Sequence, residues 1–442
     1  FYVPNRIVWD NWNDFIFGGL DGEASPQLPF IEYRSSIANS FKPGGLPDYM
    51  GIPIPDTTIT VPGTNMPKFN SLPFRAYNDI FNEYYRDQNL VPEAMFDKSI
   101  DGDEWENAGD LTWLKDRAWE KDYFTSCLPF AQKGPAVELP ADVSYKDTDY
   151  IKQGDGTDPT AQTLAQISAL GFFTNEADTE AYSIENINSL GITIADLRNS
   201  VRLQEWYEKM ARGGSRAKEA LLNMFGILSS DARLDRPEYL GGGKSAVTIS
   251  EVLNTAGDST EEPNAVVGDM AGHGIAVGAN HGFRKKMFEE HGHVIGIMSV
   301  LPKTAYQQGV HRNWTRQDKF DYFWKQFANI GEQEVKMKEV FKNWASPAPD
   351  DTDELTFGYQ SRYAEYKYNC DSVHGDFREN LDYWHMGRKF ASAPTLNEDF
   401  INADPTNRIF AVTDEEEHKL YAQVYHRFSA LRPLPYFGTP RL

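Results

Sequence analysis

The sequence predicts a mainly β protein, a jelly roll interrupted by long loops and helical insertions. The 442 residues include 34 Gly and 25 Pro, a density of turn-forming residues typical of proteins built from strands and loops. A content of 40% hydrophobic and 13% aromatic residues is sufficient for a substantial core. Beyond residue 245, short β-type runs alternate with long irregular stretches, as in a jelly roll with large insertions. We treat residues 1–442 as one domain with insertions.

Residues 1–70 consist of short apolar runs separated by turns. Arg6–Trp9 and Thr57–Val61 have the composition of strands. Six prolines lie between them, and proline lacks the backbone donor that a strand ladder needs: Pro26, Pro29, Pro43, Pro47, Pro53 and Pro55. We therefore expect this interval to be a long surface arm that lies against a neighbouring subunit.

Ser71–Gln88 is the clearest helix in the sequence. Ser71 suits the N-cap and Pro73 suits the first turn. Apolar side chains recur at three- and four-residue intervals, which predicts one wide aromatic face: Phe74, Tyr77, Ile80, Phe81, Tyr84 and Tyr85. Such a face belongs to a core more often than to a surface that stacks on bases.

Arg117–Pro135 predicts a short, rigid aromatic segment. Pro129 and Pro135 exclude a long helix, and Gly134 permits a tight turn. The side chains expected to be buried are Trp119, Tyr123, Phe124, Leu128 and Phe130. We interpret the segment as a packed structural corner.

Residues 141–196 differ from the rest in composition. This stretch contains only two basic residues, Lys146 and Lys152, but ten acidic ones: Asp142, Asp147, Asp149, Asp155, Asp158, Glu176, Asp178, Glu180, Glu185 and Asp196. This pattern predicts an acidic, exposed insertion, with a short helix over Ala161–Leu170. The alternative is a solvated loop without a role.

Two helices are predicted next, over Ile194–Met210 and Ser215–Phe225, joined at Gly213-Gly214. A basic cluster lies at this joint: Arg212, Arg216 and Lys218. Such a joint can bind phosphate, although a solvated face is the more frequent explanation.

The second half of the chain favours strands. The candidates are Ala246–Ile249, His293–Leu301, Phe357–Tyr368, Arg408–Val412 and Leu420–Leu431. Val294–Val300 is apolar on both faces, which predicts a central, buried strand. Phe320–Phe327 places four aromatic residues at helical spacing.

Motifs that carry catalytic or ligand chemistry are incomplete. Gly241–Ser245 ends like a phosphate-binding loop, but Glu238 stands where the first glycine is required. The glycines around Gly272 have the wrong spacing for a dinucleotide fingerprint. His291 and His293 would share one side of a strand, but no carboxylate follows them at metal-ligand spacing. We expect no metal, no cofactor and no catalytic site.

The charge balance constrains the partners. With 43 basic and 65 acidic residues, the chain has a formal charge of −22 and a sequence pI near 4.8. Such a chain does not condense nucleic acid by bulk charge. The two cysteines, Cys127 and Cys370, are expected to be free and buried in a reducing cytoplasm. No apolar run is long enough for a membrane span, and no signal peptide is visible.

Several ordered segments resemble one protein family. Trp119–Ser126 (WEKDYFTS) followed by Leu128-Pro129 is similar to the major capsid proteins of microviruses, the small single-stranded DNA phages, and most of all to those of gokushoviruses. Further similar segments follow in the same order along the chain: Val3–Trp12, Leu72–Asn89, Arg236–Gly243, Glu290–Gly296, Tyr306–Gly309, Phe357–Tyr366 and Arg432–Pro435. The resemblance covers most of the chain except about residues 140–196.

The resemblance implies an eight-stranded viral jelly roll whose early strands lie upstream of Phe1. It also implies a T=1 icosahedral shell around a circular single-stranded DNA genome, assembled in the bacterial cytoplasm and present in the virion. The implied partners are further copies of the chain, a small basic DNA-binding protein, an internal scaffolding protein, a DNA pilot protein and a host receptor. Residues 141–196 would then form a surface protrusion at the threefold axes.

Two sets of residues are the candidates for contact with these partners. The DNA-facing candidates combine cations with an aromatic ring: Arg212, Arg216, Lys218, Phe283, Arg284, Lys285 and Lys286. The host-facing candidates lie in the acidic insertion: Asp147, Asp155, Phe172, Phe173 and Glu180. The alternative to a capsid protein is a carbohydrate-active β-sandwich enzyme or lectin, which the 10 Trp, the 22 Tyr and the acidic surface also suit.

Overall fold

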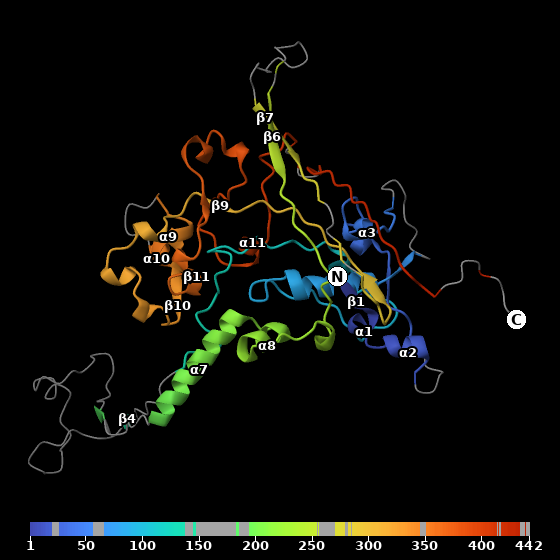
Figure 1. Cartoon of the computed structure of the whole chain (residues 1–442), viewed down its shortest axis with the longest axis horizontal. Coiled ribbons are helices and arrows are strands. Elements are labelled where there is room, and N and C mark those ends of the chain that lie inside the picture. The colour runs from blue at the N-terminus through green and yellow to red at the C-terminus, as the bar shows by residue number, and fades with distance from the viewer. Residues whose placement is uncertain are drawn as a thin grey trace, which may run out of the picture.

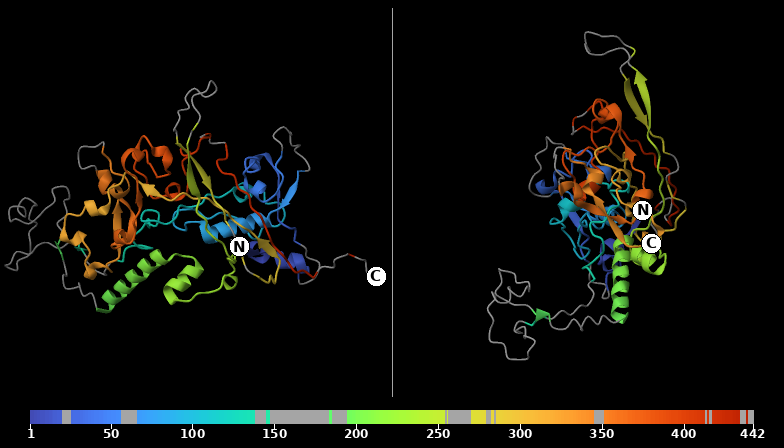
Figure 2. Two further views of the ribbon diagram at one scale, coloured as in Figure 1. Left: turned by 45° about the horizontal axis from the view of Figure 1, so that its top comes forward. Right: turned by 90° about the vertical axis from the view of Figure 1, so that its left-hand side faces the viewer.

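A computed structural model describes residues 1–19, 26–55, 66–137, 145–146, 183–184, 194–253, 255, 270–278, 282–283, 285–344, 351–412, 414, 417–433 and 438. Within these residues the strands form six small sheets of two strands each, connected by short helices and irregular segments (Figures 1 and 2). Small sheets with few long helices are compatible with a mainly β protein. The eight-stranded jelly roll stays a prediction.

Five of the six strand pairs are antiparallel. They are β1 (Tyr2–Pro4) with β8 (Gly292–Val294), β2 (Phe30–Glu32) with β3 (Lys68–Asn70), β4 (Tyr145–Lys146) with β5 (Ser183–Ile184), β6 (Thr248–Leu253) with β7 (Met270–Ile275), and β10 (Glu332–Lys336) with β11 (Thr356–Ser361). The parallel pair is β9 (Ala305–Tyr306) with β12 (Asp371–Ser372). Four pairs join consecutive strands, whereas β1–β8 and β9–β12 join strands that are distant in sequence, so these two pairings are set by the tertiary fold.

The described helices are short apart from α4, α7 and α8. They are α1 (Asn5–Val8), α2 (Trp12–Phe17), α3 (Leu46–Tyr49), α4 (Leu72–Ile80), α5 (Ala108–Thr112), α7 (Ile194–Gly213), α8 (Ala217–Phe225), α9 (Met337–Val340), α10 (Asp351–Glu354) and α11 (Glu398–Ile401). Helix α4 continues as a π-helix over Phe81–Tyr85. The helix predicted over Ser71–Gln88 is therefore confirmed as far as Tyr85, and the predicted helix pair is confirmed with its joint after Gly213, which is the last residue of α7.

Helix α4 is the centre of the first core. Leu72, Ala76 and Ile80 pack with Val3 of β1, Val8 of α1 and Trp9 directly after α1. Another side of the same helix packs against residues between 31 and 111. Full burial of each large apolar side chain contributes roughly 1.5–3 kcal/mol. The prediction that the aromatic face of this helix is core is confirmed, with Tyr84 and Tyr85 half-buried at its end.

A buried ion pair ties α4 to its surroundings. The Arg75 Nε donates to both carboxylate oxygens of Glu104, at 3.1 and 3.0 Å, and both side chains are fully buried. The other nitrogens of Arg75 donate to the carbonyls of Val8 and Ile100 at 3.1 Å each. Because every charged group here has a partner, the pair holds α1, α4 and the 100–104 segment in one arrangement.

The second core surrounds β10 and β11. The segment expected to be a packed corner supplies Tyr123, Phe124 and Cys127, which pack with Val335 and Phe357. Trp119 and Leu128 are buried as expected, whereas Phe130 is only half-buried. Both cysteines are free, with Cys127 buried and Cys370 half-buried, so the prediction of free thiols is confirmed.

The interval rich in proline does not form a detached arm. Ile31, Ile37, Phe41 and Leu46 are buried in the first core, and β2 pairs with β3. The apolar side chains between the prolines therefore anchor this interval on the chain's own body. The expectation of a surface arm is wrong for residues 26–55, and the predicted strand at Thr57–Val61 lies outside the described residues.

Several predicted strands are wrong or shorter. Arg6–Trp9 falls mainly in α1, because Pro4 ends β1 with a φ of −63° that suits a helix start. Arg408–Val412 and Leu420–Leu431 are irregular. The strand expected over Ala246–Ile249 is confirmed in part by β6, which begins at Thr248, and that over Phe357–Tyr368 by β11, which ends at Ser361.

Two predictions about apolar segments are also corrected. Val294–Val300 is buried on one side only: Ile295 and Ile297 pack on the first core, while Val294, Met298 and Val300 are exposed. Phe320–Phe327 is not one helix. It contains two 3₁₀ turns separated by extended residues at Tyr322 and Trp324. An Asp318 capping box favours the start of the first turn, and the extended backbone at Tyr322 ends it.

Candidate functional site

Three exposed apolar surfaces distinguish the described part of the chain. The first is the β6–β7 hairpin, which projects from the body in Figure 1 and in the right-hand view of Figure 2. Every side chain of β6 is exposed. The strand register places Ile249 and Leu253 on one face and Val252 with Ile275 on the other, and each is at least half exposed. A two-stranded hairpin with apolar residues on both faces is only marginally stable in water. Such a hairpin is therefore a candidate for contact with another protein surface.

The second surface is formed by the 3₁₀ turns of residues 319–327. Phe320, Tyr322, Phe323 and Trp324 are each 45–56% exposed. The turns are fixed to the body, because the Tyr363 hydroxyl accepts a hydrogen bond from the Trp324 backbone N–H at 3.1 Å. The turns therefore present a rigid group of aromatic rings to the solvent. Aromatic residues of this kind dominate protein–protein contacts.

The third surface is the outer side of residues 294–300. Val294, Met298 and Val300 are each more than half exposed, directly above the half-buried Ile295 and Ile297. This alternation is typical of a strand with one face on a core. Its outer face is apolar instead of polar, which is unusual for a surface in water.

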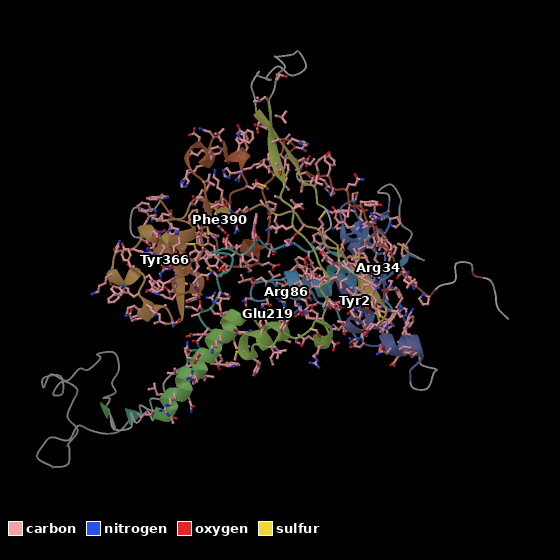
Figure 3. All side chains as sticks on the ribbon, viewed as in Figure 1. Tyr2, Arg34, Arg86, Glu219, Tyr366 and Phe390 are labelled. Carbon is pink, nitrogen blue, oxygen red and sulfur yellow. The ribbon has the colours of Figure 1, made fainter. Side chains whose placement is uncertain are left out.

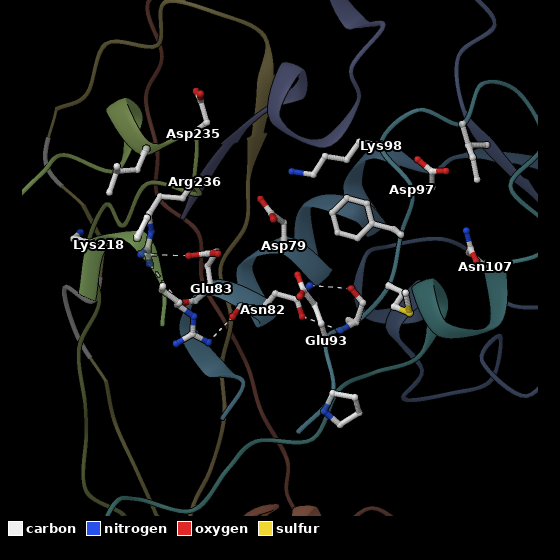
Figure 4. A pocket seen from close by; sticks show the side chains of 18 of the residues that line it. Asp79, Asn82, Glu83, Glu93, Asp97, Lys98, Asn107, Lys218, Asp235 and Arg236 are labelled. Carbon is white, nitrogen blue, oxygen red and sulfur yellow. Dashed lines mark hydrogen bonds and ion pairs between the residues drawn. The ribbon is translucent and has the colours of Figure 1, made fainter. Parts of the chain in front are cut away.

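A cleft of about 1030 Å³ lies between α4, its π-helical continuation, α8 and residues 92–107 (Figure 4). Six acidic residues line it: Asp79, Glu83, Glu93, Asp97, Glu106 and Asp235. Four basic residues also line it: Lys98, Arg216, Lys218 and Arg236. The cleft therefore has a mixed but mainly acidic lining.

Asp79 is the most perturbed group in this cleft. Its side chain lies between Lys98 and Glu83 in Figure 4, and the residue is 9% exposed. Its Oδ2 has no hydrogen-bond partner among the described residues. Burial raises the pKa of Asp79 to about 7, and the nearby Lys98 opposes this rise only in part.

The predicted basic cluster at the joint of α7 and α8 is present, but its charges are engaged. Arg212 pairs with Glu332 and contacts Gln360. Lys218 pairs with Asp231. These contacts connect the helix pair to other segments of the chain. Both cations therefore have acidic partners within the protein and do not need a phosphate ligand to neutralise them.

Arg216 caps the π-helix that follows α4. It donates to the carbonyls of Asn82 at 2.5 Å and Arg86 at 2.9 Å, and it pairs with Glu219 at 3.3 Å. Arg86 and Glu219 accordingly lie together in Figure 3. A cation at a helix C-terminus satisfies carbonyls that lack an intrahelical partner.

The remaining DNA-facing candidates lie together near β8. Lys286 pairs with Glu238 at 2.6 Å, whereas Phe283 and Lys285 are exposed. Arg284 lies outside the described residues, as do all five host-facing candidates, Asp147, Asp155, Phe172, Phe173 and Glu180, and the helix predicted over Ala161–Leu170.

The incomplete ligand motifs have local structural roles. Lys244 of the glycine-rich stretch pairs with Glu120 at 2.7 Å. His291 makes an edge contact with the Trp12 ring at 5.9 Å. Burial lowers the pKa of the half-buried His293. Among the described residues, no group of three or more His, Cys, Asp or Glu side chains is placed to hold a metal ion, and no helix is long and apolar enough to cross a membrane.

Sequence reasoning missed Asp79 and the cleft. The signal was present, since Asp79 stands directly before Ile80 in the helix whose aromatic face was expected to be core. The cleft itself had no local signal, because its walls come from segments more than a hundred residues apart.

Comparison with known proteins identifies close relatives. The model of the family described as "Capsid protein (F protein)" matches residues 1–442. The chain is 33% identical over 523 residues to the capsid protein VP1 of Chlamydia phage 1, covering all of this chain and 85% of that protein. It is 35% identical over 468 residues to the capsid protein VP1 of Bdellovibrio phage phiMH2K and 31% identical over 486 residues to that of Spiroplasma virus 4, covering all of this chain and 84% of each protein.

Proposed function

This chain belongs to the capsid protein (F protein) family of phages, and we propose that it builds a T=1 icosahedral shell around a circular single-stranded DNA genome. As a capsid protein it is a structural component of the virion that assembles with further copies of itself, and it is not an enzyme. The alternative of a carbohydrate-active enzyme or lectin has no support among the relatives. Within the family we assign the chain to the gokushovirus branch.

The observation that carries the shell proposal is the set of apolar surfaces on the described part of the subunit. The β6–β7 hairpin, the 319–327 turns and the outer side of residues 294–300 belong to three separate parts of the chain. A two-fold dimer needs one self-complementary patch, whereas closed higher symmetry needs several different patches. Three distinct surfaces are therefore suited to an icosahedral shell.

The fold that we propose for the assembled subunit is a viral jelly roll. In support, residues 293–300 alternate between a core-facing and an exposed apolar side, as a strand does before its partner sheet is in place. The wedge shape of a jelly roll allows subunits to meet around symmetry axes.

The charge of the chain suggests how the genome is held. With a formal charge of −22 the shell needs a separate source of positive charge. We assign this role to a small basic DNA-binding protein, with Phe283, Arg284 and Lys285 as the best remaining contacts of this chain to DNA. Arg212, Arg216, Lys218 and Lys286 are weaker candidates, because the described structure engages them in ion pairs.

Further partners follow from the same proposal. An internal scaffolding protein and a DNA pilot protein would act during assembly and delivery in the bacterial cytoplasm and at the host surface. The acidic residues 141–196 form the proposed protrusion that meets a host receptor, an assignment that rests on their composition.

The test is assembly of the full-length protein expressed together with its scaffolding protein. Electron microscopy should show uniform closed particles, and sedimentation should give one fast species. Nuclease treatment before extraction should leave a protected circular single strand. Soluble, folded subunits that never form closed particles would contradict the proposal.

A further inference from the structure

An exposed stretch near the end of the chain has no counterpart in the surfaces above. We call His418–Pro433 the C-terminal arm. It contains neither helix nor strand, and Figure 1 shows it as the plain red trace leading toward the C-terminus. Tyr421 and Leu431 are as exposed as in an extended chain, at 101% and 103%, and Tyr425 and Phe428 are 85% and 84% exposed.

The backbone of the C-terminal arm is equally free. No N–H or C=O group of residues 418–433 makes a hydrogen bond to another residue that the structure describes. The start of the arm meets the body, where the His418 ring lies so close to Gly44 that a Cβ there would stand 2.7 Å from it. At about 3.3 Å per residue, the roughly 16 residues that start at this contact reach about 50 Å, more than the radius of a single subunit.

Charge separates the arm from the rest of the chain. Residues 418–442 contain four Lys or Arg and no Asp or Glu, which leaves 39 basic and 65 acidic residues, a formal charge of −26, in residues 1–417. The boundary is sharp, because Asp414–Glu417 directly before the arm is entirely acidic. A basic, aromatic strip is thus joined to a strongly acidic body.

We propose that the C-terminal arm docks on the acidic surface of a second copy of this chain and so links neighbouring subunits. This inference rests on the proposed shell, and it names one of the shell's contacts. Leu420, Val424 and Leu431 lie between the aromatic side chains of the arm. Aliphatic side chains pack well on an apolar protein surface but cannot stack on nucleic-acid bases, so they favour a protein partner. The unpaired backbone suits addition to the edge of a partner's strand.

The first experiment compares particle yield from full-length variants expressed with the scaffolding protein. One variant carries Tyr421→Ser, Tyr425→Ser and Phe428→Ser, and another carries Arg427→Glu and Arg432→Glu. Each should lower the yield of closed particles on the order of a hundredfold, because each removes burial or charge complementarity at every repeat of the contact. The matched control, Arg427→Lys with Arg432→Lys, keeps the charge and should assemble like the wild type.

The outcomes separate the arm from the shell. Wild-type yields of filled particles from both variants would overturn the role of the arm and leave the shell intact. Normal yields of particles that have lost their DNA would also overturn it, since the arm would then bind nucleic acid. Failure of the unaltered chain to form particles would overturn the shell and the arm together.

A cross-linking measurement tests the contact of the arm even if the serine and glutamate variants fail to fold. Particles assembled from a mixture of isotopically light and heavy chains, each carrying a photoreactive phenylalanine analogue at position 425, would be irradiated and digested. Cross-links between light and heavy peptides are expected in about half of the products, as random mixing requires when the contact is between copies. Cross-links that join only peptides of the same label would overturn the proposal.

Discussion

Replacing Asp79 by asparagine should stabilise the subunit at neutral and alkaline pH. Asp79 is 9% exposed, its Oδ2 has no hydrogen-bond partner among the residues that the structure describes, and its pKa is raised to about 7 from 3.8. In the unfolded chain this group ionises near pH 4, but in the folded chain it holds its proton until near pH 7. Stability is therefore lost as the pH rises from about 4 to about 7 and stays low above that range.

The magnitude follows from the size of the shift. About three pKa units at about 1.4 kcal/mol each correspond to about 4 kcal/mol that the wild type has lost at pH 8. A side-chain amide cannot ionise, so Asp79→Asn should be more stable than the wild type by up to about 4 kcal/mol at about pH 8 and of nearly equal stability at about pH 4. Urea unfolding of unassembled subunits, followed by tryptophan fluorescence at both pH values, measures this difference.

Asp97→Asn is the matched control in the same cleft. Asp97 is exposed, and its pKa is lowered because the hydroxyl and the backbone N–H of Ser99 donate to it. The same substitution should therefore give no stabilisation at pH 8. A difference between Asp79→Asn and the wild type that did not change with pH, or a less stable Asp79→Asn at pH 8, would refute the reasoning and would mean that the carboxylate is compensated in the folded subunit.

Three further predictions concern the buried ion pair, the helix cap and the hairpin. Arg75→Met leaves Glu104 buried and unpaired, and it should lower the free energy of unfolding by about 3–5 kcal/mol in urea titrations, whereas Arg34→Met at a partly exposed pair should change it by less than about 1 kcal/mol. Arg216→Ala removes the donor to the Asn82 and Arg86 carbonyls and should destabilise the subunit by about 1–2 kcal/mol, which thermal unfolding would detect; an unchanged melting temperature would argue against the cap. Ile249→Ser with Leu253→Ser on the exposed hairpin should leave subunit stability within about 0.5 kcal/mol but reduce particle yield in sedimentation, and undiminished particles would remove the hairpin from the shell contacts.

The sequence predicted local elements better than pairings. Helix α4 was predictable because its buried side chains follow one helical period, and α7 and α8 because Gly213-Gly214 separates two periodic runs. Leu420–Leu431 has strand composition but no pairing partner among the described residues. Strand composition describes what a segment can pair with, whereas the partner is supplied by distant parts of the fold or by another subunit.

In the candidate sites, too, the residues of one segment were predictable, whereas their partners from distant segments were not. The clustering of Arg212, Arg216 and Lys218 was predictable from the helix joint, but their acidic and carbonyl partners come from other segments. Charge patterns in one segment therefore overstated the number of free cations. The apolar outer side of residues 294–300 was predicted to be buried, and it is exposed in the single chain because no described segment covers it.

The two free thiols have a consequence for a particle that leaves its host. Burial raises the pKa of Cys127 far above its usual range and that of Cys370 to about 11. Only a thiolate attacks a disulfide or an oxidant at an appreciable rate, so both sulfurs are poorly reactive at neutral pH. The subunit should therefore undergo little thiol oxidation in aerated medium, and its endurance there depends on packing and contacts between copies.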